Sequence, residues 1–134
     1  MSSASSNDLT DLAERVRELD DEKRDAVRRR NAAIRAARAS GERPADLTRD
    51  AGLHAQMVHR IIAAAQPPAE PGDVAALAEA ARTATARHEA ALALRNDAIR
   101  TAIDEAGMRV MDVMKSTGLS RPAIHLIRTD ASTH

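Results

Sequence analysis

Residues 109–128 read RVMDVMKSTGLSRPAIHLIR, and residues 43–62 read RPADLTRDAGLHAQMVHRII. Each stretch predicts a short helix, a tight turn at a glycine (Gly118 or Gly52) and a second short helix. In both stretches an apolar residue follows the glycine directly. Two more apolar residues lie five and eight positions after that first apolar residue. That spacing puts the apolar residues on one face of the second helix and leaves the other face to solvent. The chain therefore contains one helix-turn-helix pattern twice.

The repetition extends into the residues that precede each pattern. Five residues recur at an offset of 65, so that Arg30, Asn31, Ala33, Ile34 and Arg35 match Arg95, Asn96, Ala98, Ile99 and Arg100. After one inserted residue the offset is 66, which relates Gly41 to Gly107 and His59 to His125. A fixed offset over so many positions indicates an internal duplication. Each copy consists of a predicted long helix followed by a helix-turn-helix motif.

The predicted fold class is all-α. The predicted helices cover residues 7–40, 44–51, 54–64, 73–106, 109–116 and 120–128. We expect Ser6 or Asn7 to cap the first helix, Asp73 to cap the fourth and Ser120 to cap the last. The predicted domains are 7–64 and 73–128, joined by a Pro-rich linker at 65–72, with flexible ends at 1–6 and 129–134.

The two long helices carry apolar seams of matching length. In the first, Leu9, Leu12, Val16 and Leu19 recur every three or four residues, which is typical of coiled coils. We therefore expect the long helices to pair as an antiparallel coiled-coil-like hairpin within one chain. The alternative is that the first seam pairs with a second copy of the chain in a homodimer.

Composition excludes several classes of function. The 134 residues include no cysteine and no aromatic residue, which removes disulfides, thiolate metal sites and stacking platforms for single strands. Histidines are not spaced as metal ligands, and we predict no metal, no cofactor and no enzymatic nucleophile. No apolar run reaches membrane-span length and no signal peptide is visible, so we expect a cytoplasmic, nucleoid-associated protein without a membrane partner.

Both motifs resemble the three-helix, wingless helix-turn-helix domains of bacterial, actinobacterial-type DNA-binding proteins. In that superfamily the second helix of the motif enters the major groove. The resemblance implies base-edge contacts from His54, Gln56, His59 and Arg60 in the first motif and from Ser120, Arg121, Pro122, His125 and Arg128 in the second. The sequence departs from the superfamily four residues before each glycine, where Thr48 and Met114 replace the usual alanine. Met114 is expected to open the crossing angle of the second motif.

Basic residues cluster around the first motif. Residues 26–64 hold eight basic and three acidic side chains, although the whole chain has a net charge of zero. The candidates for phosphate contact are Arg28, Arg29, Arg30, Arg35, Arg38, Arg43, Arg49 and Lys115. Alternatively, residues 28–30 pair with carboxylates of a neighbouring helix. The charge excess makes the first motif the stronger predicted DNA binder.

The sequence thus predicts a double-stranded DNA-binding protein, with transcriptional regulation as the expected role. Helices 54–64 and 120–128 would read the major groove, together or singly. The alternative is a coiled-coil interaction module in which the motifs are structural. Its partner would be a second copy of the chain or another helical protein, bound through the long helices.

Overall fold

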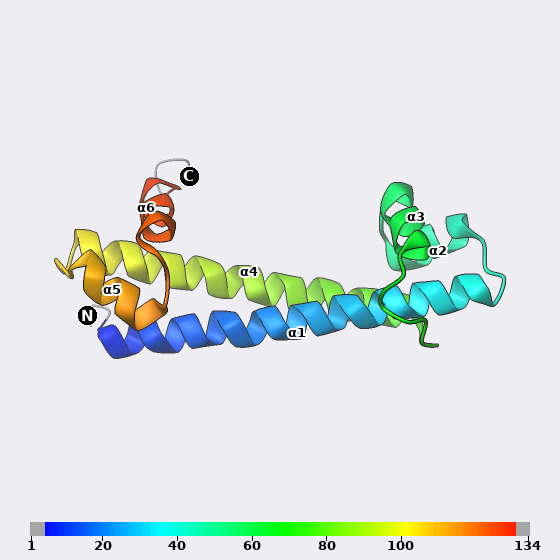
Figure 1. Ribbon diagram of the computed structural model, residues 1–134, viewed down its shortest axis with the longest axis horizontal. Helices are drawn as coiled ribbons and strands as arrows, with labels where there is room; N and C mark the ends of the chain where they lie inside the picture. The colour runs from blue at the N-terminus through cyan, green and yellow to red at the C-terminus, as the bar shows by residue number, and fades with distance from the viewer. Residues whose placement is uncertain (1–4, 131–134) are drawn as a thin grey trace. The chain divides into compact units, whose positions relative to one another are not determined.

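The computed structural model describes residues 5–130, which form six α-helices (Figure 1). The helices are α1 (Ser6–Ala39), α2 (Pro44–Ala51), α3 (Ala55–Ala63), α4 (Val74–Asp104), α5 (Val110–Thr117) and α6 (Arg121–Asp130). The predicted all-α fold is confirmed, and α1 and α4 pack together as the matching seams predicted. Every predicted helix is present with its bounds shifted by two residues at most. Flexible ends were predicted at 1–6 and 129–134. Residue 6 begins α1 and residues 129–130 end α6, so the prediction is wrong there, and residues 1–4 and 131–134 lie outside the described residues.

Side-chain caps fix where three of the helices begin. The backbone N–H of Asp8 donates to Ser5 Oγ (3.2 Å), and the N–H of Ser5 donates to Asp8 Oδ2 (3.1 Å). This reciprocal pair is a capping box, so Ser5 caps α1 and the predicted Ser6 or Asn7 is wrong. Asp73 and Ser120 act as predicted. Asp73 Oδ1 accepts from the N–H of Ala76 at 3.0 Å. Ser120 Oγ accepts from the N–H three residues later at 3.2 Å.

Each motif turns at a glycine in the left-handed conformation. Gly52 has φ 66° and ψ 31°, and Gly118 has φ 76° and ψ 7°. Their backbone N–H groups close the preceding helices by donating to Thr48 (3.0 Å) and Met114 (2.8 Å). Glycine adopts this conformation without the steric cost of a Cβ atom, so the turn stops one helix and starts the next within a few residues.

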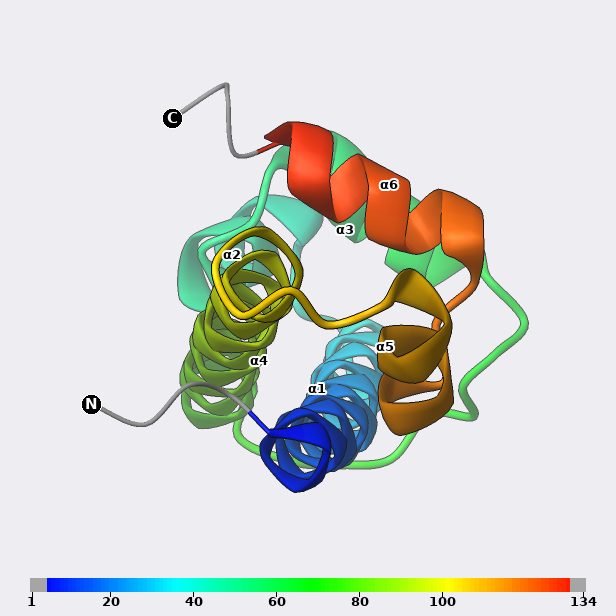
Figure 2. The same ribbon diagram turned by 90° about the vertical axis from the view of Figure 1, so that its left-hand side faces the viewer.

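The described residues divide into two compact units that cut across the sequence repeats. One unit, here the α5–α6 unit, joins the start of α1, up to Leu19, to the chain from Arg87 onward. The other, here the α2–α3 unit, covers Asp20–Ala86. Each unit therefore contains a segment of α1, an antiparallel segment of α4 and one helix-turn-helix motif. Figure 2 shows the start of α1, in blue, beside α5 and the end of α4 within the first of these units.

The core of the α5–α6 unit contains residues from four helices. Its buried cluster consists of Leu9, Ile99, Ala102, Val113, Ile124 and Ile127. Leu9 has no solvent-exposed surface, although it lies about a hundred residues before the motif that it contacts. Val16, Leu19 and Ala91 form a smaller cluster between α1 and α4 in the same unit. The first turns of α1 thus complete the second motif.

The core of the α2–α3 unit has the same construction. Its buried cluster consists of Ala33, Ile34, Leu47, Ala51, Val58, Ile61, Val74 and Ala78. Here Val74, at the start of α4, occupies the place that Leu9 has in the other unit, and the two residues are related by the offset of 65. Each motif therefore packs on the end of its own long helix and on the beginning of the other repeat's long helix.

Candidate nucleic-acid interface

The second helix of each motif has one buried and one exposed face. In α3, Val58 is fully buried and Ile61 is 6% exposed. In α6, Ile124 is 1% and Ile127 is 8% exposed. These apolar pairs hold each helix on its core, because they belong to the buried clusters of the two units. The opposite face is left available for a ligand.

All of the predicted base-edge residues lie on exposed faces. They are His54, Gln56, His59, Arg60, Ser120, Arg121, Pro122, His125 and Arg128. Two of them already have partners. Ser120 caps α6, and Arg128 Nη2 donates to Asp104 Oδ1 at 2.8 Å. Within residues 5–130 the side chains of Gln56, Arg60 and Arg121 make no ion pair or hydrogen bond, so they can reach a ligand without breaking a contact.

The exposed face of α6 borders a hollow of about 360 Å³. Its lining consists of Val110, Arg121, Pro122, Ile124, His125 and Arg128. Arg121, His125 and Arg128 are spaced by four and three residues, so they share one side of the helix. The hollow therefore combines an apolar floor with three basic side chains that the sequence had singled out.

Acidic residues are sparse around each second helix; at α6 the exceptions are Asp130, its last residue, and Asp104, which pairs with Arg128. No Asp or Glu occurs between Asp50 and Glu70, or between Asp112 and Asp130. The units as a whole, however, hold nearly equal numbers of basic and acidic side chains, because the acidic start of the α2–α3 unit offsets the basic run after it. The positive charge is thus a local property of the motif faces.

The phosphate candidates on α1 are largely engaged within the protein. Arg28 and Arg29 both pair with Asp25 of their own helix, with 3.0 Å from Arg29 Nε to Asp25 Oδ2. The alternative prediction had placed these carboxylates on a neighbouring helix. Arg30 donates from Nε (3.0 Å) and Nη2 (2.9 Å) to Asn31 Oδ1. Burial lowers the pKa of the Arg30 guanidinium, and the charge of Arg82 lowers it further.

Arg35 has a structural position that recurs in the second motif. Its Nη1 donates to the carbonyl oxygen of Ala65 (3.2 Å) and to that of Pro67, both in the linker that follows α3. Its repeat partner, Arg100, donates from Nη1 to the carbonyl oxygen of Ile127 in α6 at 3.0 Å. In both motifs an arginine of the long helix thus contacts a backbone carbonyl oxygen near the C-terminal end of the second helix, within α6 for Arg100 and just after α3 for Arg35. We leave Arg30 and Arg35 out of the proposed interface.

A second pair of arginines holds the first helix of each motif from the opposite repeat. Arg82 of α4 donates from Nη1 to the carbonyl oxygen of Ala51 at 3.0 Å. Arg17 of α1 donates from Nη1 to the carbonyl oxygen of Thr117 at 3.5 Å. The two arginines are 65 positions apart, so this contact is also duplicated. Sequence reasoning missed both, although the offset would have revealed them. Charged donors near the C-terminal carbonyls stabilise a helix end.

The remaining phosphate candidates flank the motifs and are exposed. They are Arg38, Arg43, Arg49 and Lys115. Arg43 and Arg49 pair with Asp46 at 3.1 and 3.3 Å, in bridges whose arginines are 80% and 74% exposed. Such surface pairs are weak and exchange readily for a phosphate. The offset of 66 adds Arg109, which matches Arg43, is exposed, and was missing from the sequence-based set.

The two departures from the superfamily pattern are accommodated differently. Thr48 Oγ1 donates to the carbonyl oxygen of Pro44 at 2.9 Å, one turn earlier in α2. Met114 is half-buried and packs against the core cluster of the α5–α6 unit. A flexible thioether side chain adapts to the space between helices, which explains how methionine replaces a small residue there.

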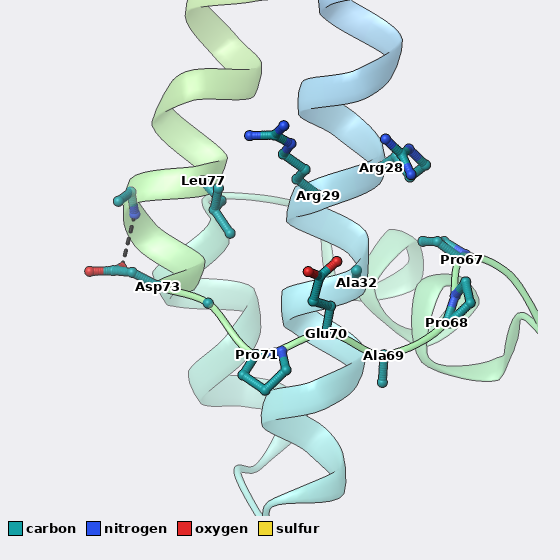
Figure 3. Close-up of a pocket in the computed structure, with 12 residues that line it drawn as sticks. Arg28, Arg29, Ala32, Pro67, Pro68, Ala69, Glu70, Pro71, Asp73 and Leu77 are labelled. Atoms are coloured by element: carbon teal, nitrogen blue, oxygen red, sulfur yellow. Dashed lines mark hydrogen bonds between the residues drawn. The ribbon is translucent and has the colours of Figure 1, made fainter.

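A second hollow, of about 800 Å³, lies beside the Pro-rich linker (Figure 3). Arg28 and Arg29 of α1 line one side, and the linker residues 67–73 line the other. The linker is tied down where the N–H of Glu70 donates to the carbonyl oxygen of Ala32 at 3.1 Å. Its other lining residues include Ala32 and Leu77, and we assign no ligand to it.

The comparisons with known proteins identify no relative. No protein-family model, no curated protein and no solved structure matches the chain. Across residues 5–130 no group of three or more His, Cys, Asp or Glu side chains could hold a metal ion. None of the described helices combines the length and apolar character that crossing a membrane requires.

Proposed function

We propose that the chain binds double-stranded DNA through the exposed faces of α3 and α6 and acts as a transcriptional regulator. One observation carries this proposal. Two motifs of one chain each bury the apolar face of their second helix and expose a face that bears the sequence-predicted base-edge residues, with no Asp or Glu in residues 51–69 or 113–129. A major groove accepts one α-helix, and the donors on these faces match base edges.

The charges around each face support the same proposal. Arg43 precedes α2 and Arg49 lies in its last turn. Arg109 and Lys115 have the equivalent positions at α5. Exposed basic side chains on the first helix of such a motif can contact DNA phosphates while the second helix lies in the groove. Because these contacts release counterions, log K should fall linearly with log salt, with a slope of about −0.9 for each phosphate contacted.

The test is fluorescence anisotropy with a random 30-base-pair duplex at several salt concentrations. We expect tight binding at low salt and a steep negative slope. Arg60→Ala should weaken binding about fivefold to thirtyfold, which corresponds to about 1–2 kcal/mol for a lost base or phosphate contact. The matched control is Arg24→Ala, which removes the same charge from a residue that is 76% exposed and pairs with Asp20 on α1.

The rival function, a helical interaction module, gives the opposite result. It predicts no binding at low salt or an affinity that does not respond to salt, and equal effects of Arg60→Ala and Arg24→Ala. Either outcome would overturn the DNA-binding proposal. A partner of the long helices would then have to be sought.

A further inference from the structure

The exposed faces of α3 and α6 are equivalent in position and different in chemistry. The turn glycines align them at an offset of 66, which pairs Arg60 with Leu126 and Gln56 with Pro122. Both α6 residues are exposed, as are their α3 equivalents. Duplication of the fold has therefore kept the buried face while the face toward a ligand has diverged.

The largest chemical difference between the two exposed faces is at Leu126. It is 61% exposed, and it does not belong to the buried cluster formed by its neighbours Ile124 and Ile127. Directly before it lies His125, which matches His59 in α3. A single exposed leucine on a protein surface requires no explanation by itself. This one, however, occupies the position of an arginine, and the exposed residues Arg121, His125 and Arg128 of the same helix are basic.

We propose that the two motifs read different DNA sequences, with Arg60 and Gln56 of α3 contacting purine edges, Arg121 of α6 contacting guanine, and Leu126 contacting the methyl group of a thymine. This inference rests on the proposed function, since it names the bases that the two faces would recognise. The thymine methyl is the one apolar group on the major-groove edges, and an apolar side chain is its natural partner. Arginine pairs bidentately with guanine, and glutamine with adenine.

The exposed groups of α3 and α6 fit these roles without rearrangement. Arg121 and Gln56 make no ion pair or side-chain hydrogen bond among the described residues, so neither must give up an internal partner. Leu126 gains burial on contact with an apolar group, whereas Arg60 at the same position could not bury its charge there without a partner. A chain with two unlike faces is suited to a non-palindromic set of bases.

The first experiment is selection of bound duplexes from a random library with the full chain. We expect two distinct enriched DNA sequences, one of which contains both guanine and thymine. Arg60→Ala should abolish the enrichment of one of these DNA sequences, and Arg121→Ala should abolish that of the other. This inference would be overturned if one DNA sequence were enriched as a repeat on both strands, or if both variants abolished the same enriched sequence. DNA binding itself would stand in either case.

The second experiment isolates the methyl contact. Each thymine of the selected duplex is replaced in turn by uracil, which removes only the methyl group. At one position we expect an affinity loss of about fourfold, as for burial of one methylene-sized group. Leu126→Ala should bind the thymine and uracil duplexes equally. Leu94→Ala, a control at a residue that is 62% exposed on α4, should keep the full discrimination.

The possible outcomes distinguish the proposed base contacts from the proposed DNA binding itself. Leu126→Arg should lose the thymine preference and make the salt slope steeper by about 0.9 if the new charge reaches a phosphate. Equal binding of thymine and uracil duplexes by the unmodified chain would overturn the role of Leu126. Failure to bind any duplex at low salt would overturn the proposed function itself. Circular dichroism of each variant checks that the fold is retained, which is expected because Leu126 and Arg121 are exposed.

Discussion

Truncation of Leu9 to alanine should destabilise the motif at the far end of the sequence. Leu9 has no exposed surface and packs with Ile99, Val113 and Ile124 in the core of the α5–α6 unit. A buried Leu→Ala change costs about 2–5 kcal/mol, because it removes apolar contacts and leaves a cavity. The native chain is expected to be stable by only about 5–15 kcal/mol, so this single change should remove a large share of it.

Two measurements check this prediction. Urea unfolding followed by circular dichroism gives the free energy of unfolding, which should fall by about 3 kcal/mol. Hydrogen exchange followed by mass spectrometry shows where protection is lost, and we expect the loss in α5 and α6 to exceed that in α2 and α3. The matched control is Leu94→Ala, which removes the same atoms from a side chain that is 62% exposed and should change stability by less than about 0.5 kcal/mol.

The reciprocal variant tests the same packing rule in the α2–α3 unit. Val74→Ala should lower the free energy of unfolding by about 2 kcal/mol, because it removes two methyl groups from a residue that is only 8% exposed. The loss of protection from hydrogen exchange should be greatest in α2 and α3. The reasoning would be refuted if Leu9→Ala were no more costly than Leu94→Ala, or if each variant lowered protection mainly in the motif of its own repeat.

Further expected outcomes concern the turns, the arginine contacts and the first cap. Gly52→Ala and Gly118→Ala should each cost about 1 kcal/mol in urea unfolding, because both glycines have positive φ. The cost should be larger at Gly52, where a Cβ atom would lie 3.0 Å from Arg82 Nη1, than at Gly118, where it would meet nothing within 4 Å; equal costs would contradict this account. Arg82→Ala should increase exchange at the end of α2 and leave the end of α5 unchanged, and uniform changes would argue against a local contact. Ser5→Ala should destabilise the chain by about 1 kcal/mol in thermal or urea unfolding, whereas Ser5→Asp, which keeps a cap, should not.

Much of the site was accessible from the sequence because its determinants are local. The turn glycines, the apolar positions after them and the caps at Asp73 and Ser120 act over a few residues, so spacing alone located the helices. The same periodicity identified which side chains of α3 and α6 would be exposed. The repeat offset also identifies equivalent residues outside the predicted site. It relates Arg60 to Leu126 and Arg17 to Arg82, and so marked residues that the sequence-based set omitted.

The phosphate set was less accessible, because arginines of similar appearance in the sequence have different surroundings in the fold. Arg28 and Arg29 lie one turn after Asp25 and pair with it, which the helical spacing could have shown. Arg35 contacts the carbonyl oxygen of Ala65, thirty residues later. No local pattern reports such a contact, since it depends on where the linker after α3 meets α1.

The sequence by itself determined the helices, the duplication and the face that each second helix buries, because hydrophobic periodicity and glycine geometry are short-range properties. Only the tertiary structure decided which segments share a core. Leu9 completes the second motif and Val74 completes the first, so each compact unit draws on both repeats. The physical reason is that a two-helix motif has too little apolar surface to be stable alone, and the long helices supply what it lacks.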